Sequence, residues 1–167
     1  MTKFEDAVKA LADQRREHFL TCKPSELIML ALEDLEKVEA QKDVYRVDMG
    51  VFHSPLGEDD GRVRCAVCLG GSVLAQTVKL DSAKLWMGES NHYKAGMRVW
   101  DDPVTPRIYA LDDFRSGDID CGLEMMLGID CPDNVQATVT MCEYEDDPVE
   151  FKSRLRWIAK HLAERGL

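Results

Sequence analysis

The sequence contains no apolar run long enough to cross a bilayer, although 45% of its 167 residues are hydrophobic. The stretch MTKFEDAVKALADQRREHF carries acids throughout, which excludes a secretory signal or a transit peptide. We therefore expect a cytoplasmic protein with no membrane partner. Its length and its 31% of charged residues favour one globular domain that covers residues 1–167.

Basic residues are scarce between positions 101 and 150. This block holds fourteen acids against Arg107 and Arg115, and it accounts for the net charge of −10 because the rest of the chain is close to neutral. Such a field repels phosphate backbones, which argues against direct nucleic-acid binding, and it attracts basic protein surfaces. A surface that serves only solubility is the alternative. The acids that we predict to bind a partner are Asp112, Asp113, Asp118, Asp120, Glu143, Glu145, Asp146 and Asp147.

The six cysteines include a single Cys-x-x-Cys pair, Cys65 and Cys68. Structural zinc sites usually draw their four ligands from two such pairs, so we predict no metal, with His53, Cys65 and Cys68 as the alternative ligand set. A thioredoxin-like βαβ pattern around the pair is missing. The glycines that follow lack the lysine and hydroxyl of a phosphate loop, and we predict no cofactor. In a cytosolic protein the thiols stay reduced.

A nucleophilic cysteine is a second possibility at Cys68, because this residue opens the segment CLGGSVLAQTV, which predicts a helix with a glycine-rich start. A helix N-terminus favours the thiolate form of cysteine. The alternative function is therefore a small cysteine-dependent hydrolase with Cys68, His92 and Asp101 as its catalytic residues. The flanking signature of papain-like proteases is absent, and no complete catalytic constellation is evident.

We favour a packing role for this segment. Cys68, Gly71, Ser72 and Ala75 are small and share one face of the predicted helix. Glycine destabilises a helix by roughly 1 kcal/mol relative to alanine, a cost that is reasonable where a neighbour must approach closely. We therefore predict that another helix packs tightly on this face, and that the protein has no catalytic residues.

Periodicity predicts a helix-rich α+β domain with a small antiparallel sheet. Helices are expected over 2–20, from Pro24 through SELIMLALEDLEKVEA, over 68–78, 105–117 and 119–127, and from the DPVE capping sequence to the end; a short helix is expected from Ser82. Strands are expected over 44–49, at RVRCAV as the second half of a hairpin, at MRVW, and at NVQATVTMCEY, whose alternation is the clearest of all; SPLGEDDG is expected to be a loop.

Three expectations concern how these elements meet. The first two helices are joined by a short break and should form an antiparallel hairpin. The last helix has a basic exposed side, which we expect to balance the acidic block. The tryptophans Trp86, Trp100 and Trp157 are anchors either of a core or of an interface, and a homo-oligomer is left open.

The sequence resembles small bacteriophage-encoded proteins in the order QRREHFL, KPSELIMLALEDLEKVE, VDMGVFHSP, CAVCLGGSVLA and YALDDFRSGDI. The resemblance covers about two thirds of the chain. It implies expression in a bacterial host, and it implies no catalytic residues because no activity is assigned to such proteins. Together with the acidic block it predicts a non-enzymatic phage accessory protein whose partner is a host or phage protein with a basic surface.

Overall fold

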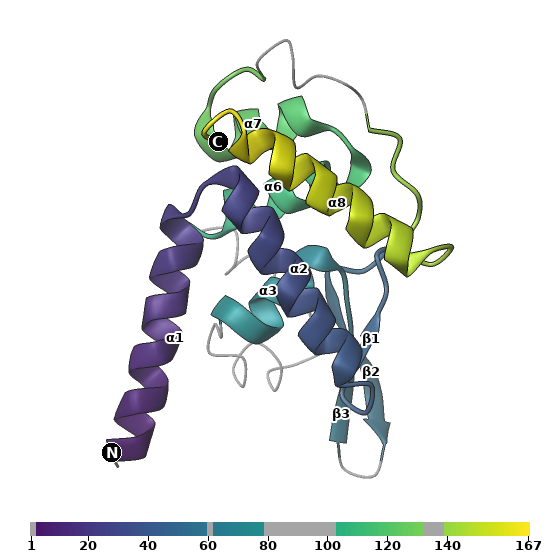
Figure 1. The fold of residues 1–167 in the computed structure, drawn as a ribbon. Coiled ribbons are helices and arrows are strands. Elements are labelled where there is room, and N and C mark those ends of the chain that lie inside the picture. The colour runs from purple at the N-terminus through teal and green to yellow at the C-terminus, as the bar shows by residue number, and fades with distance from the viewer. Residues whose placement is uncertain (1–2, 60–61, 79–102, 132–138) are drawn as a thin grey trace.

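The computed structural model describes residues 3–59, 62–78, 103–131 and 139–167 (Figure 1). The described part is a helix-rich α+β fold, as the sequence predicts. The helical elements are α1 (Lys3–Thr21), α2 (Pro24–Ala40), α3 (Leu69–Val73), the π-helical turn η1 (Leu74–Val78), α6 (Thr105–Ser116), α7 (Ile119–Leu127) and α8 (Pro148–Ala163). The strands are β1 (Tyr45–Val47), β2 (His53–Asp59) and β3 (Arg62–Val67).

The sheet is mixed rather than antiparallel throughout. Its strand order is β1-β3-β2, with β2 antiparallel to β3 and β1 parallel to β3. The hairpin partner of β3 is therefore β2, which occupies most of the predicted loop SPLGEDDG, and not β1. Pro55 and Gly57 flank an irregularity in the pairing, and β2 is an edge strand, where proline is tolerated. Its serine, proline and glycine residues are typical of turns, which is why the composition predicts a loop here.

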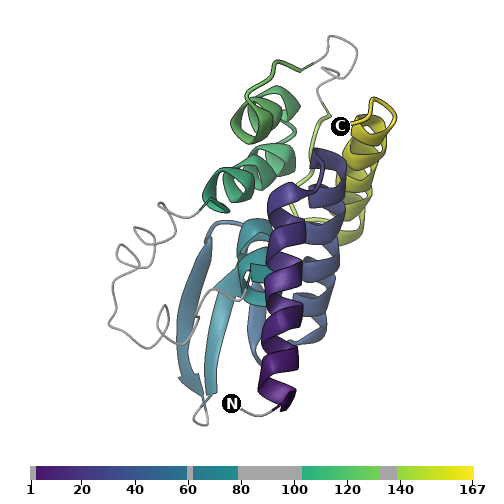
Figure 2. The ribbon, with the colours of Figure 1, turned by 90° about the vertical axis from the view of Figure 1, so that its left-hand side faces the viewer.

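Helix α2 (Pro24–Ala40) lies at the centre of the core. It buries residues around most of its circumference, including Leu27, Ile28 and Leu35. One hydrophobic cluster joins it to the C-terminal end of α1, to α3, α6 and α7, and to α8. Figure 2 shows α1, α2 and α8 on one side of the molecule and α6 and α7 on the other.

Helices α1 and α2 run in opposite directions, but they splay apart instead of packing as a close hairpin. Figure 1 shows α1 projecting from the body, with α3 between the separated ends of α1 and α2. The C-terminal end of α1 is held by Phe19, which is fully buried. Nearer the middle, Arg15 donates to the buried carboxylate of Asp34 on α2 at 2.9 Å.

The clearest predicted strand is not a strand in the part that can be compared. Residues 139–143 have no regular secondary structure, and 132–138 lie outside the described residues. Val139 and Met141 are partly buried against the core and pass beside Gly117, at the junction of α6 and α7. Residues 139–143 therefore pack beside the helices without forming a strand.

Most helix boundaries agree with the capping signals. Gly117 ends α6 in a left-handed conformation, with φ of 86°, and α7 spans the predicted residues. Val104, not Thr105, is the N-cap of α6. The predicted helix from Ser82 and the MRVW strand fall outside the described residues. No helix in the segments described is long and apolar enough to cross a membrane.

Candidate functional site

Cys68 occupies the N-cap of α3, at the point where β3 ends. Its side chain accepts a hydrogen bond from the Gly71 amide at 3.5 Å and donates to the carbonyl oxygen of Phe52 at 3.6 Å. Only 5% of the residue is exposed. The predicted helix start is correct, and the thiol is used inside the fold as both an acceptor and a donor.

The glycines after Cys68 are required by close packing. A Cβ atom at Gly71 would lie 1.8 Å from the carbonyl oxygen of Phe52, and one at Gly70 would lie 2.8 Å from Cγ2 of Ile108 on α6. Close packing at these glycines is therefore confirmed, but the predicted kind of neighbour is wrong for the predicted face. At Gly71 the neighbour is the backbone just before β2, and the helix α6 approaches at Gly70, which is not part of that face.

The environment of Cys68 opposes its use as a nucleophile. Burial raises the pKa of the thiol, and the amides of Gly71 and Gly70 only partly offset this effect. A thiol that stays protonated is a poor nucleophile. The other residues of the alternative hydrolase, His92 and Asp101, lie outside the described residues.

The alternative metal ligands do not form a site. Among the described residues, no group of three or more histidine, cysteine or acidic side chains is placed to hold an ion. Burial raises the pKa of Cys65 and of Cys68, and it lowers the pKa of His53 to about 3. His53 and Cys65 lie on the paired strands β2 and β3, where Cys65 is buried and His53 is partly exposed.

Four of the predicted binding acids are engaged in the fold. Asp118 and Asp147 cap α7 and α8 by accepting from backbone amides of the first turn. Asp120 accepts from the Cys131 amide at 2.7 Å, and Glu145 accepts from the Met49 amide at 3.0 Å. The sequence predicted the cap at Asp147, but the long-range bonds of Asp120 and Glu145 carry no local signal.

The remaining predicted acids are Asp112, Asp113, Glu143 and Asp146. Asp113 is half-buried, and burial raises the pKa of its carboxyl group. The other three are exposed, as is Glu124 on α7, which the predicted set omits. We call Asp112, Glu124, Glu143 and Asp146 the acidic surface.

Backbone contact places the segment that begins at Val139 against the α6–α7 junction. A Cβ atom at Gly117 would lie 2.4 Å from the carbonyl oxygen of Val139, so the segment that leads to Glu143 runs against the α6–α7 junction. Figure 2 shows this segment between α6 and α7 on one side and α8 on the other. Glu143 and Asp146 lie further along this segment, toward the start of α8 (Figure 1).

Two basic side chains of α8 form ion pairs with α2, and a third forms an ion pair within α8. Lys152 pairs with Glu39 and Arg156 with Glu36, both on α2, and Arg154 pairs with Glu150 in the first turn of α8 itself. We expected this helix to balance the acidic block. Lys152 and Arg156 instead attach α8 to α2, whereas Arg154 pairs with Glu150, which is an acid of the block itself.

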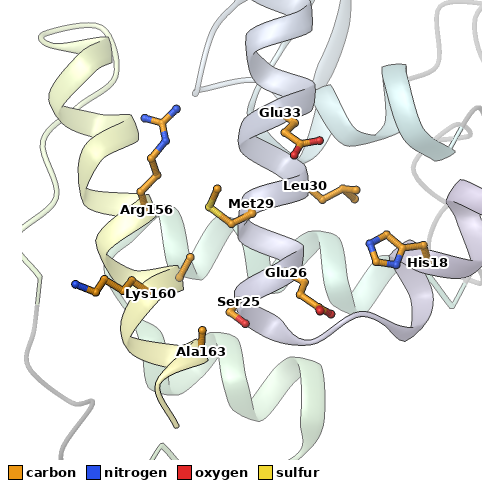
Figure 3. A pocket seen from close by; sticks show the side chains of 10 residues that line it. His18, Ser25, Glu26, Met29, Leu30, Glu33, Arg156, Lys160 and Ala163 are labelled. Carbon is orange, nitrogen blue, oxygen red and sulfur yellow. The ribbon is translucent and has the colours of Figure 1, made fainter. Parts of the chain in front are cut away.

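A shallow groove between α2 and α8 is a feature that sequence reasoning missed. Its volume is about 550 Å³, and Figure 3 shows Met29 of α2 directed toward α8, with Glu26 and Glu33 on α2 and Arg156 and Lys160 on α8 on either side of it. The remaining lining residues are His18, Ser25, Leu30, Ala159 and Ala163. The signal in the sequence was an acidic stripe beside the apolar face of one helix and a basic stripe on the other. Only the fold sets these stripes side by side.

No protein-family model matches this sequence, and neither a curated protein nor a solved structure shows significant similarity to it.

Proposed function

We propose that this protein is a non-enzymatic accessory protein that acts in the cytoplasm of a bacterial host. It binds a host or phage protein that has a basic surface, and it does so through the acidic surface. The interaction is electrostatic, so it speeds association and selects the partner more than it adds raw affinity. No chemical step is part of the proposal.

The observation that supports this proposal is the segregation of negative charge. Asp112, Glu124, Glu143 and Asp146 are all exposed, whereas the cations of α8 are paired with acids on α2 and on α8 itself. Asp112 pairs with Arg115 at 2.8 Å, but both partners are partly exposed, so this pair neutralises the surface weakly. A local excess of one charge sign raises the association rate of an oppositely charged partner.

The test is a comparison of two variants with equal net charge. The first neutralises the acidic surface with Asp112→Asn, Glu124→Gln, Glu143→Gln and Asp146→Asn. The control neutralises four exposed acids of the N-terminal region with Asp6→Asn, Asp13→Asn, Glu17→Gln and Asp43→Asn. The acids that cap helices or bond to backbone amides are left intact in both variants, so the fold is retained.

Each protein is immobilised and exposed to bacterial lysate, and the captured proteins are quantified by mass spectrometry. We expect the natural chain and the control to enrich the same basic protein, with binding that weakens as salt is raised from about 50 to about 300 mM. The acidic-surface variant should lose it. Equal capture by both variants, or capture that is indifferent to salt, would contradict the proposal.

A further inference from the structure

We propose that the groove between α2 and α8 is a docking surface for a second copy of this chain, which forms a two-fold dimer. The proposal concerns a different face from the acidic surface and does not depend on it. It is argued from the charges on the two walls of the groove, the register of its helices and its apolar floor.

The walls of the groove carry opposite charges. Glu26 and Glu33 lie on the α2 wall, and Arg156 and Lys160 lie on the α8 wall (Figure 3). Within one chain, the ion pairs between the two helices include Glu36–Arg156 and Glu39–Lys152, toward the C-terminal end of α2. Glu33 is exposed, and Lys160 is 71% exposed with only a distant contact to Glu164 at 3.9 Å. Both side chains are therefore accessible to a partner.

The register of the two helices makes this face complementary to itself. Residues 36 and 39 of α2 pair with residues 156 and 152 of α8, so the helices are antiparallel and Glu33 lies level with the interval between Arg156 and Lys160. A two-fold axis parallel to the helices, along the groove, places α2 of each copy over α8 of the other at the same level. Glu33 of each chain then faces the basic wall of its partner.

Two acid-to-base contacts are formed in this arrangement, one on each side of the axis. A two-fold interface requires that one patch match its own image, and the acidic and basic walls on opposite sides of the groove satisfy this requirement. Electrostatic complementarity of this kind fixes the register of association and excludes other partners.

The floor between the charged walls is apolar. Met29 is 40% exposed at its centre, and Ala159 and Ala163 of α8 lie beside it. The alanines leave room for the methionine of the second copy, and methionine adapts readily to such a contact. The apolar strip is narrow, so charge contributes a large share of the affinity and the dimer is expected to weaken as salt is added.

Charge reversal provides a sharp test. Glu33→Lys places two lysines of each chain opposite two lysines of a second copy, and Lys160→Glu does the same with acids. We expect each variant to self-associate at least about tenfold more weakly than the natural chain, by sedimentation velocity at about 50 mM salt and up to about 200 µM protein. An equimolar mixture of the two variants should form a heterodimer, because every contact across the interface is then between opposite charges.

Control variants distinguish an effect of the groove residues from an effect of net charge or of misfolding. Asp43→Lys and Arg46→Glu make the same two changes in net charge at exposed positions outside the groove, and they should leave self-association unchanged. Circular dichroism and thermal unfolding confirm that each variant is folded. A natural chain that stays monomeric under these conditions would overturn the proposal, as would a mixture that fails to restore association. A dimer that survives both charge reversals would show that another face carries it.

Discussion

Among the described glycines, Gly71 leaves the least space for an added side chain. The missing Cβ is replaced by the carbonyl of Phe52, a backbone atom that cannot rotate away. We expect Gly71→Ala to lower the free energy of unfolding by about 3 kcal/mol, measured by urea denaturation. Gly128→Ala is the matched control, because that glycine has φ of +66° but a Cβ added there would have no atom within 4 Å, and it should cost only about 1 kcal/mol. Equal losses of unfolding free energy in the two variants would show that backbone conformation, and not the contact with Phe52, determines the cost.

The cysteines should differ in reactivity according to their burial. Cys22, Cys65, Cys68 and Cys131 are buried, whereas Cys121 and Cys142 are partly exposed. Asp113 raises the pKa of the Cys121 thiol, so we expect Cys142 to be alkylated first and Cys121 second at pH 8. Brief maleimide labelling followed by peptide mapping measures this order. Fast labelling of Cys68 would instead revive the hydrolase hypothesis.

His53 should make the fold sensitive to acid. Burial lowers the pKa of His53 to about 3 from an ordinary value of 6.5, so between these pH values the unfolded chain binds a proton that the folded chain does not. The unfolding free energy therefore falls as the pH decreases, and we expect a contribution of about 1–2 kcal/mol between pH 6.5 and 5.

The measurement is the pH dependence of urea unfolding for three proteins. His53→Gln should lose this part of the slope, whereas His18→Gln should retain it because His18 is exposed. Identical slopes for the natural chain and His53→Gln would show that His53 does not titrate as expected.

At the scale of elements, one side chain of α6 binds the C-terminal end of α1. Nη1 of Arg107 donates to the carbonyl oxygens of Phe19 at 3.0 Å and Cys22 at 2.7 Å, which satisfies the C-terminal end of α1. Cations at this end also interact favourably with the helix dipole. The splayed helix is therefore attached to the body at its C-terminal end by Phe19 and by this arginine.

Removing Arg107 should loosen α1. We expect Arg107→Ala to cost about 2 kcal/mol of stability, because it removes a charged donor from the Cys22 carbonyl and leaves the Phe19 carbonyl with the weak Cys22 thiol donor at 3.5 Å, and to speed amide exchange in the last turns of α1. Arg115→Ala on the same helix breaks only the partly exposed pair with Asp112 and should cost less than about 0.5 kcal/mol. Denaturant titration and hydrogen exchange distinguish the two variants. The interpretation fails if α1 exchanges equally in both.

At the scale of the whole molecule, net charge opposes folding. The excess of ten negative charges generates self-repulsion that salt relieves, whereas salt also weakens ion pairs such as Lys152–Glu39. We expect repulsion to dominate, so the melting temperature should rise as salt is increased from about 20 to about 300 mM. Neutralising the acidic surface should reduce this rise. A melting temperature that falls with salt would show that the ion pairs dominate.

Local signals in the sequence predicted much of the helical framework. The Asp147 cap with Pro148 defined the start of α8, and Gly117 defined the end of α6. The packing role of the glycines after Cys68 was also predicted, because small residues in a helix reveal that something lies close. These predictions succeed because each depends on residues within about one turn of one another.

Pairings between distant segments were not predicted, because they depend on residues far apart in the sequence. The strand β2 has the composition of a loop, and it forms because β3 supplies hydrogen-bond partners. The NVQATVTMCEY pattern alternates like a strand, yet residues 139–143 have no regular secondary structure, and Val139 and Met141 pack beside Gly117. Alternation records which side chains are buried, and it does not specify whether a sheet or a helix surface buries them.

The sequence by itself determined the helix-rich composition, the capping of individual helices and the excess of acids between residues 101 and 150, because these are sums over the chain or contacts within one turn. Only the tertiary structure decided that Asp120 and Glu145 accept from backbone amides elsewhere in the chain, and that the acidic stripe of α2 lies beside the basic stripe of α8. Charge is a property of residues, but an interface is a property of their arrangement, and that arrangement follows from contacts between residues far apart in the chain.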